Sequence, residues 1–204
     1  MPTYTINFLN NSSSPGNFCI FQQNPNNPTP GSFPLAWLVQ SANPHAKVPI
    51  SWNTDFYFFW AKTGELRPGG IFNAGEAFLT SLAENNAITL TKQDNNYKFI
   101  DQKSGYQQGV LSVSTDTTTA FNQASIGIGM SGSGTLAVQA QPNMTFSFSP
   151  IQGYWITFGE FKQGQVLNQS EIPNAVKIVF PHGIFSMNAT INEDGTWTVT
   201  QGLD

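Results

Sequence analysis

The chain has 204 residues, of which 39% are hydrophobic and only 10% are charged, and its formal net charge is −4 at neutral pH. Its 8 Lys and Arg residues are scattered and include a single arginine, Arg67, so the sequence lacks the basic stripe that binds nucleic-acid phosphates. The single cysteine, Cys19, cannot form an internal disulfide, and its apolar neighbours predict a buried core residue.

The first part of the chain alternates polar and apolar residues with the two-residue period of β-strands. Thr3 to Leu9 predicts a first strand, and Asn17 to Gln22 is expected to be its hairpin partner. Prolines and asparagines between Gln23 and Ser32 predict a long surface loop. Further strands are expected at 34–40, 46–52 and 56–60, the last being the most aromatic run of the chain.

One segment has a weakly helical pattern, because Ala77, Phe78 and Leu82 predict one or two turns at most between Gly75 and Asn85. Strands are then expected at 88–92, 97–101, 110–114, 125–130, 135–141, 144–148, 154–161, 176–180, 184–192 and 196–201. This pattern predicts an all-β chain with at most one or two short helices. The expected fold is an antiparallel β-sandwich with jelly-roll or immunoglobulin-like connectivity, in a single domain over residues 1–204.

Residues 127–132 match the G-x-G-x-x-G spacing of dinucleotide-binding loops. Such a loop must be followed by a helix whose N-terminus receives the pyrophosphate. Residues 133–138 instead continue as a strand, so we predict no cofactor here. The glycines are interpreted as positions of close contact within the sheet, or of a bulge.

Ionisable residues form no pattern typical of a catalytic centre. The two histidines, His45 and His182, each follow a proline in a predicted turn and lack partners at metal-ligand spacing, so no metal site is predicted. Most acidic residues also lie in predicted turns. Glu160, which is flanked by apolar residues, is the acid best placed for chemistry, so a hydrolase that uses Glu160 or a histidine-containing site remains one alternative.

Aromatic residues supply the other candidate binding residues. The segment from Trp52 to Trp60 is interpreted as core, with the alternative that its rings line a groove where a sugar ring or an apolar ligand stacks. Neighbouring Asn and Gln side chains suit carbohydrate, because amides form hydrogen bonds with hydroxyl groups. The candidate ligand-binding residues are therefore Trp37, Trp52, Tyr57, Trp60 and Glu160.

Several segments carry a likeness to a known family. They are Asn10-Asn11-Ser12-Ser13, Phe18-Cys19-Ile20-Phe21-Gln22, Leu35-Ala36-Trp37 and the run from Trp60 to Gly69. In these segments the chain resembles the RhiA-like bacterial proteins, which are rhizosphere-expressed and quorum-regulated and have no established enzymatic role. The resemblance covers most of the chain and implies a bacterial protein that is cytoplasmic or released. Its motifs mark turns and core, so it implies no site residues.

We therefore predict a non-enzymatic binding protein, or one that assembles with itself, since a weakly charged surface permits dense packing. The alternative is a toxin-like protein, such as an insecticidal one, that acts at a membrane or glycan surface. The partners considered are a glycan, an apolar ligand, a membrane surface and a second copy of the chain. No apolar run approaches the ~18 residues of a membrane span. The start of the sequence has no signal-peptide pattern, so we expect a cytoplasmic protein, with release by another route left open.

Overall fold

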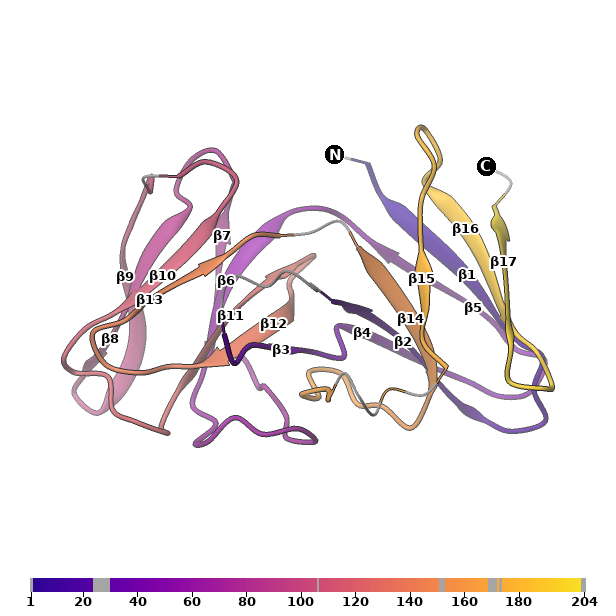
Figure 1. Cartoon of the computed structure of the whole chain (residues 1–204), viewed down its shortest axis with the longest axis horizontal. Coiled ribbons are helices and arrows are strands. Elements are labelled where there is room, and N and C mark those ends of the chain that lie inside the picture. Colours follow the sequence, from indigo (N-terminus) through magenta and orange to yellow (C-terminus); the bar gives the residue numbers. More distant parts are fainter. Residues whose placement is uncertain are drawn as a thin grey trace.

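The computed structural model describes residues 2–23, 30–105, 107–150, 153–168, 172 and 174–202. Within these residues the chain forms strands β1 to β17 and no helix. The strands make four sheets, in which most neighbouring strands are antiparallel (Figure 1). The predicted all-β class is therefore confirmed.

Two sheets form the lobe that contains both ends of the described chain, and we call it the terminal lobe. Sheet A has the order β17-β16-β1-β5, made of β1 (Tyr4–Asn10), β5 (Lys47–Trp52), β16 (Ser186–Ile191) and β17 (Trp197–Gln201). Sheet B has the order β15-β14-β2-β4, made of β2 (Gly16–Gln22), β4 (Leu38–Ala42), β14 (Tyr154–Gly159) and β15 (Val176–Ile178). The inner faces of both sheets enclose one core, which includes Ile6, Phe8, Phe18, Ile20, Ile50, Trp52, Tyr154 and Ile156.

The other two sheets form the central lobe. Sheet C has the order β3-β12-β11-β6-β7, made of β3 (Phe33–Pro34), β6 (Phe56–Ala61), β7 (Glu76–Thr80), β11 (Ser125–Met130) and β12 (Ser133–Gln139). Sheet D has the order β13-β10-β8-β9, made of β8 (Ala87–Gln93), β9 (Asn96–Lys103), β10 (Leu111–Thr115) and β13 (Thr145–Phe148). These sheets enclose a second core, which includes Phe58, Ile88, Leu90, Leu111, Val113, Ile126 and Ile128.

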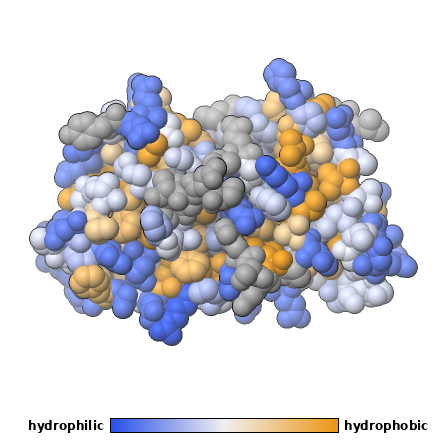
Figure 2. All heavy atoms as spheres, in the orientation of Figure 1, coloured by the Kyte–Doolittle hydropathy of each residue, from blue (hydrophilic) through white to orange (hydrophobic). Residues whose placement is uncertain are grey.

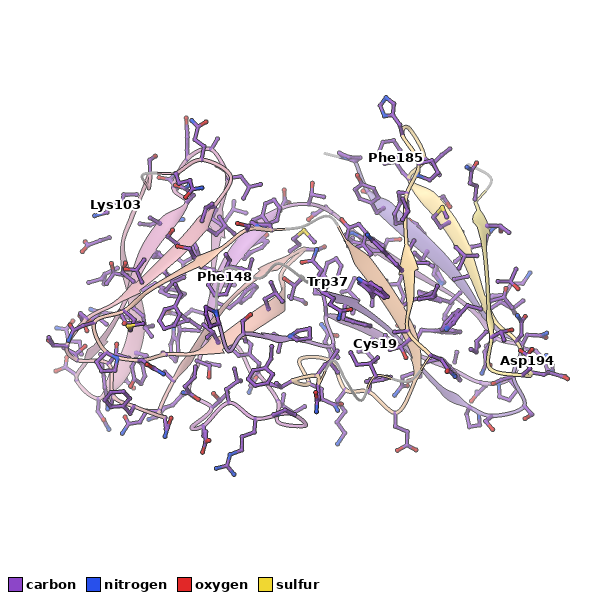
Figure 3. All side chains as sticks on the ribbon, in the orientation of Figure 1. Cys19, Trp37, Lys103, Phe148, Phe185 and Asp194 are labelled. Atoms are coloured by element: carbon purple, nitrogen blue, oxygen red, sulfur yellow. The ribbon has the colours of Figure 1, made fainter. Side chains whose placement is uncertain are left out.

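Backbone hydrogen bonds and one tryptophan join the two lobes. Phe72, between β6 and β7, donates to the carbonyl of Gly164, which lies after β14, and Val166 donates to the carbonyl of Gly70, each at 2.8 Å. The indole of Trp37 is fully buried and donates to the carbonyl of Met130 in β11 over 3.0 Å. Figure 3 shows Trp37 in the middle of the molecule, between the two groups of sheets. The prediction of one domain over 1–204 stays a prediction.

Two local predictions are wrong. Strands β1 and β2 are not hairpin partners, because β1 pairs with β5 and β16 while β2 pairs with β4 and β14. The buried amide of Asn10 donates to the carbonyls of Ser14 and Ala42, and this stabilises the passage of the chain from sheet A to sheet B. In place of helical turns, residues 76–80 form edge strand β7, in which Phe78 pairs with Phe58 on β6. Residues 24–29 of the predicted loop lie outside the described residues.

The glycines of the G-x-G-x-x-G run behave as the sequence indicates. Gly127 and Gly129 lie in β11, where an added Cβ would approach the carbonyl oxygens of Leu136 and Ser133 to 2.3 and 2.0 Å. The pairing of β11 with β12 also shifts register between Ile128 and Gly129. Close sheet contact and a bulge are both present, and β12 follows the turn as a strand.

Candidate functional site

Trp37 and Trp52 lie in the core of the terminal lobe. Neither side chain has more than 2% of its surface exposed. Their ring centroids are 5.5 Å apart in an edge-on arrangement, and Trp52 also stacks on Tyr4 at 5.9 Å. Because protein side chains cover these rings, their contribution is the packing of the core.

Tyr57 and Trp60 are half-buried and lie on opposite faces of β6. The indole of Trp60 donates to the Glu76 carboxylate over 2.8 Å, and the backbone of Gly75 lies against its ring. Tyr57 packs near Phe59 on the other face, with a centroid distance of 6.0 Å. The structure therefore does not bring the predicted aromatic residues together in one groove.

Glu160 is exposed and lies just after β14. It borders an open hollow of about 500 Å³ that is also lined by Asn17, Asn43 and Lys162. Glu160 supplies the one carboxyl group among the residues lining this hollow, whereas most glycoside hydrolases use a pair of carboxyl groups.

The nucleophilic and metal-ligating residues are dispersed. Within the described ranges, no three His, Cys, Asp or Glu side chains lie close enough together to hold a metal ion. Cys19 is fully buried in sheet B, as predicted, and burial raises the pKa of its thiol far above the usual range. The thiolate that would act as a nucleophile is therefore absent at neutral pH.

The outer face of sheet A has a different composition, and we call it the amide face. Alternate residues of each strand point away from the core, because their neighbours Ile6, Phe8, Met187 and Ala189 are buried in it. The outward residues are Thr5, Asn7 and Leu9 on β1, Lys47, Pro49 and Ser51 on β5, Ser186, Asn188 and Thr190 on β16, and Thr198 and Thr200 on β17. Lys47 is the one charged residue among them.

Strand pairing places the two asparagines of this face side by side. β1 and β16 run parallel, with Asn7 opposite Asn188 and Thr5 opposite Ser186. The Asn7 amide nitrogen donates to the side-chain oxygens of Asn188 and Ser186, each at 3.3 Å. Asn188 in turn donates to the backbone carbonyl of Gln201 over 3.2 Å. These contacts orient both side-chain amides on the amide face.

The amide face is hollowed at its centre. An open hollow of about 540 Å³ is lined by side chains or backbone of Asn7, Phe8, Leu9, Lys47, Val48, Pro49, Asn188, Thr190 and Thr200. The hydroxyls of Thr190 and Thr200 have no hydrogen-bond partner among the described residues. The hollow therefore offers neutral donors and acceptors beside the apolar surfaces of Leu9 and Pro49.

Sequence reasoning missed this face, although its signal is present. Thr5, Asn7 and Leu9 alternate with buried residues, as do Asn188 and Thr190. The alternation indicates which side chains point outward. It does not indicate that β1 and β16, at opposite ends of the chain, are neighbours.

The described residues include no helix long and apolar enough to cross a membrane. A family model described as RhiA matches residues 1–202. The chain is also 30% identical over 199 residues to Protein RhiA of Rhizobium leguminosarum bv. viciae. The aligned region covers 96% of this chain and 85% of that protein. The comparison with solved structures found no match.

Proposed function

We propose that this chain, which belongs to the RhiA family, is a non-enzymatic binding protein that recognises a neutral glycan on the amide face of sheet A. The observation that carries this proposal is the hollow in which Asn7 and Asn188 lie beside Thr190 and Thr200. A sugar hydroxyl both donates and accepts hydrogen bonds, and so do amide and hydroxyl side chains.

Apolar contacts complete the match to a sugar. Leu9 and Pro49 project from neighbouring strands into the same hollow as the asparagines. A pyranose ring presents C–H groups as well as hydroxyls, so a surface that combines apolar and amide groups contacts both. With Lys47 as the one charge, the face has no basis for selecting a strongly anionic ligand.

The composition of the hollow supports binding without chemistry. General acid–base catalysis needs a titratable group within hydrogen-bond distance of the reacting atom. Lys47 is the one titratable side chain among the residues lining this hollow, and no Asp, Glu, His or Cys accompanies it there. We also infer that the two facing sheets of each lobe form a β-sandwich, the layered arrangement in which one face of each sheet is left free for binding.

A glycan array probed with the purified chain tests this proposal. We expect binding to neutral oligosaccharides that changes little between low and high salt, because screening weakens charge–charge attraction and not neutral hydrogen bonds. Replacing both asparagines by alanine, Asn7→Ala with Asn188→Ala, should weaken binding by about tenfold or more, as expected when two hydrogen bonds are lost.

The outer face of sheet D provides a matched control. Ser114 and Thr145 lie opposite each other there, with their hydroxyls 3.1 Å apart. The double variant Ser114→Ala with Thr145→Ala should retain full binding. If no neutral glycan binds, or if both double variants lose the same affinity, the proposal is wrong.

A further inference from the structure

The loop of residues 179–185, which connects β15 to β16, stands out from the body of the terminal lobe. In Figure 1 it forms the narrow projection beyond the ends of the strands near both termini. Its tip is a tight turn, in which Ile184 donates to the carbonyl of Pro181 over 3.0 Å and Gly183 has a φ of 80°. This geometry is that of a type II turn, which requires a residue such as glycine at the positive φ.

Two exposed apolar side chains flank the tip of this loop. Val179 is 64% exposed and Phe185 is 39% exposed. The sequence has no Asp, Glu, Lys or Arg from 178 to 192. Figure 2 shows hydrophobic residues gathered on this part of the surface, beneath a hydrophilic tip. Large exposed apolar side chains that cluster in one segment mark an interaction site more often than isolated ones do.

Aromatic contacts keep the loop extended. The Tyr4 ring lies 5.0 Å from Phe180 and 5.5 Å from Phe185, both in edge-on arrangements. Trp52 contacts Phe180 with a centroid distance of 5.8 Å. The backbone N–H of Thr5 donates to the carbonyl of Phe185 over 2.8 Å. The base of the loop is therefore fixed to the core, and the loop cannot fold back onto sheet A without breaking these contacts.

We propose that the 179–185 loop inserts into the interfacial region of a lipid bilayer and holds the protein at a membrane surface. The loop is convex and has no Asp, Glu, Lys or Arg, with the exposed His182 at its tip as its one titratable side chain, so it fits a deformable apolar layer better than a rigid polar surface. The aromatic residues at its base, including the half-buried Tyr4, lie where interfacial tyrosines and tryptophans of membrane proteins contact headgroups. This contact involves none of the residues that line the hollow of the amide face and requires no sugar.

Flotation with vesicles of phosphatidylcholine alone tests the proposal, since these vesicles carry neither sugar nor net charge. The protein should float with the vesicles, and Val179→Asp should reduce the bound fraction about tenfold or more because a charge disfavours insertion. A second variant, Pro181→Asp, should also reduce the bound fraction. It retains the backbone carbonyl of residue 181, which accepts the hydrogen bond from Ile184 that closes the turn.

Phe121 provides the matched control, because its side chain is 67% exposed in a turn of the central lobe. Phe121→Asp should leave flotation unchanged, and circular dichroism establishes that each variant is folded. If the wild-type protein does not float, if it floats only with anionic vesicles, or if Phe121→Asp weakens flotation as much as Val179→Asp, the loop is not a membrane contact. Glycan binding measured on the same variants should be unaffected, so the two proposals fail independently.

Discussion

The two lobes are built from similar pairs of sheets but fill their cores differently. In the terminal lobe, Trp37, Trp52 and Tyr154 form a cluster of mutually contacting rings at the centre of the core. The buried residues of the central-lobe core include no tryptophan, and their aromatic rings belong to Phe and Tyr, with Phe58 and Phe99 in edge-on contact. The aromatic cluster reaches the surface through Tyr4 and fixes the base of the 179–185 loop.

The outer faces differ as well. Sheet A presents paired asparagines in a hollow, whereas sheet D presents a row of hydroxyls in which Thr89, Ser114 and Thr145 are aligned across three strands. Both rows follow from the same two-residue alternation. The difference teaches that alternation determines which side chains point outward in both lobes, while strand pairing determines which polar side chains lie opposite one another.

Among the predicted changes in stability, we expect replacement of Trp37 to cause the largest loss. Trp37→Ala removes a fully buried indole of the terminal-lobe core and its hydrogen bond to Met130 in the central lobe. We expect a loss of about 3–5 kcal/mol in the free energy of unfolding, measured by urea denaturation with circular dichroism. Trp60→Ala, which removes a half-buried indole of the central lobe, should lose less. Equal losses would contradict the view that Trp37 joins the lobes.

Tight packing in the central lobe gives the second prediction. Gly129→Ala would place a Cβ 2.0 Å from the backbone oxygen of Ser133, which is closer than real Cβ contacts, so β11 and β12 must separate. We expect a loss of about 2 kcal/mol or more in the free energy of unfolding.

A matched control for this variant is Gly134→Ala. Its Cβ would meet the Cδ1 atom of Leu35 at 3.0 Å, and this flexible side-chain end can move. Its loss should be smaller, again by urea denaturation. If Gly129→Ala is as stable as the wild-type protein, the close approach of the two strands is not required.

The smallest predicted effect is a pH-dependent change in stability at the turn between β16 and β17, which contains Asp194. Asp194 accepts hydrogen bonds from the hydroxyl and backbone N–H of Thr196, and these lower the pKa of its carboxyl group. A lowered folded-state pKa means stabilisation that is present above the unfolded value of about 3.9 and is lost as pH falls through the folded value. The difference in Tm between wild type and Asp194→Ala should therefore be greatest near neutral pH and shrink below about pH 4.

Asp94, in the β8–β9 turn of the central lobe, is the control for this measurement. Its carboxylate has no hydrogen bond to another described residue, so Asp94→Ala tests the turn without such a contact. A difference in Tm for Asp194→Ala that stays constant from pH 7 to pH 3 would mean that the Thr196 hydrogen bonds do not stabilise the folded state.

Much of the local structure was predictable from the sequence. The alternation predicted strands close to the observed positions of β1, β5, β6 and β11, and the apolar neighbours of Cys19 predicted its burial. The strand-like pattern of residues 133–138 also predicted that no helix follows the glycines of β11, and β12 lies there. Residues 75–85 were predicted less well, because edge strand β7 depends on pairing with β6 and its own helical spacing is misleading.

The sequence by itself determined that alternate side chains would be neutral and outward, because side-chain direction in a strand depends only on the local backbone. Only the tertiary structure decided that Asn7 meets Asn188, since pairing between β1 and β16 depends on chain segments far apart in sequence. The tertiary structure also determined the length of the projecting loop. The sequence predicts strands at 176–180 and 184–192, which would leave only a short turn between them. The observed strands end at Ile178 and resume at Ser186, because a strand extends only where a neighbouring strand pairs with it.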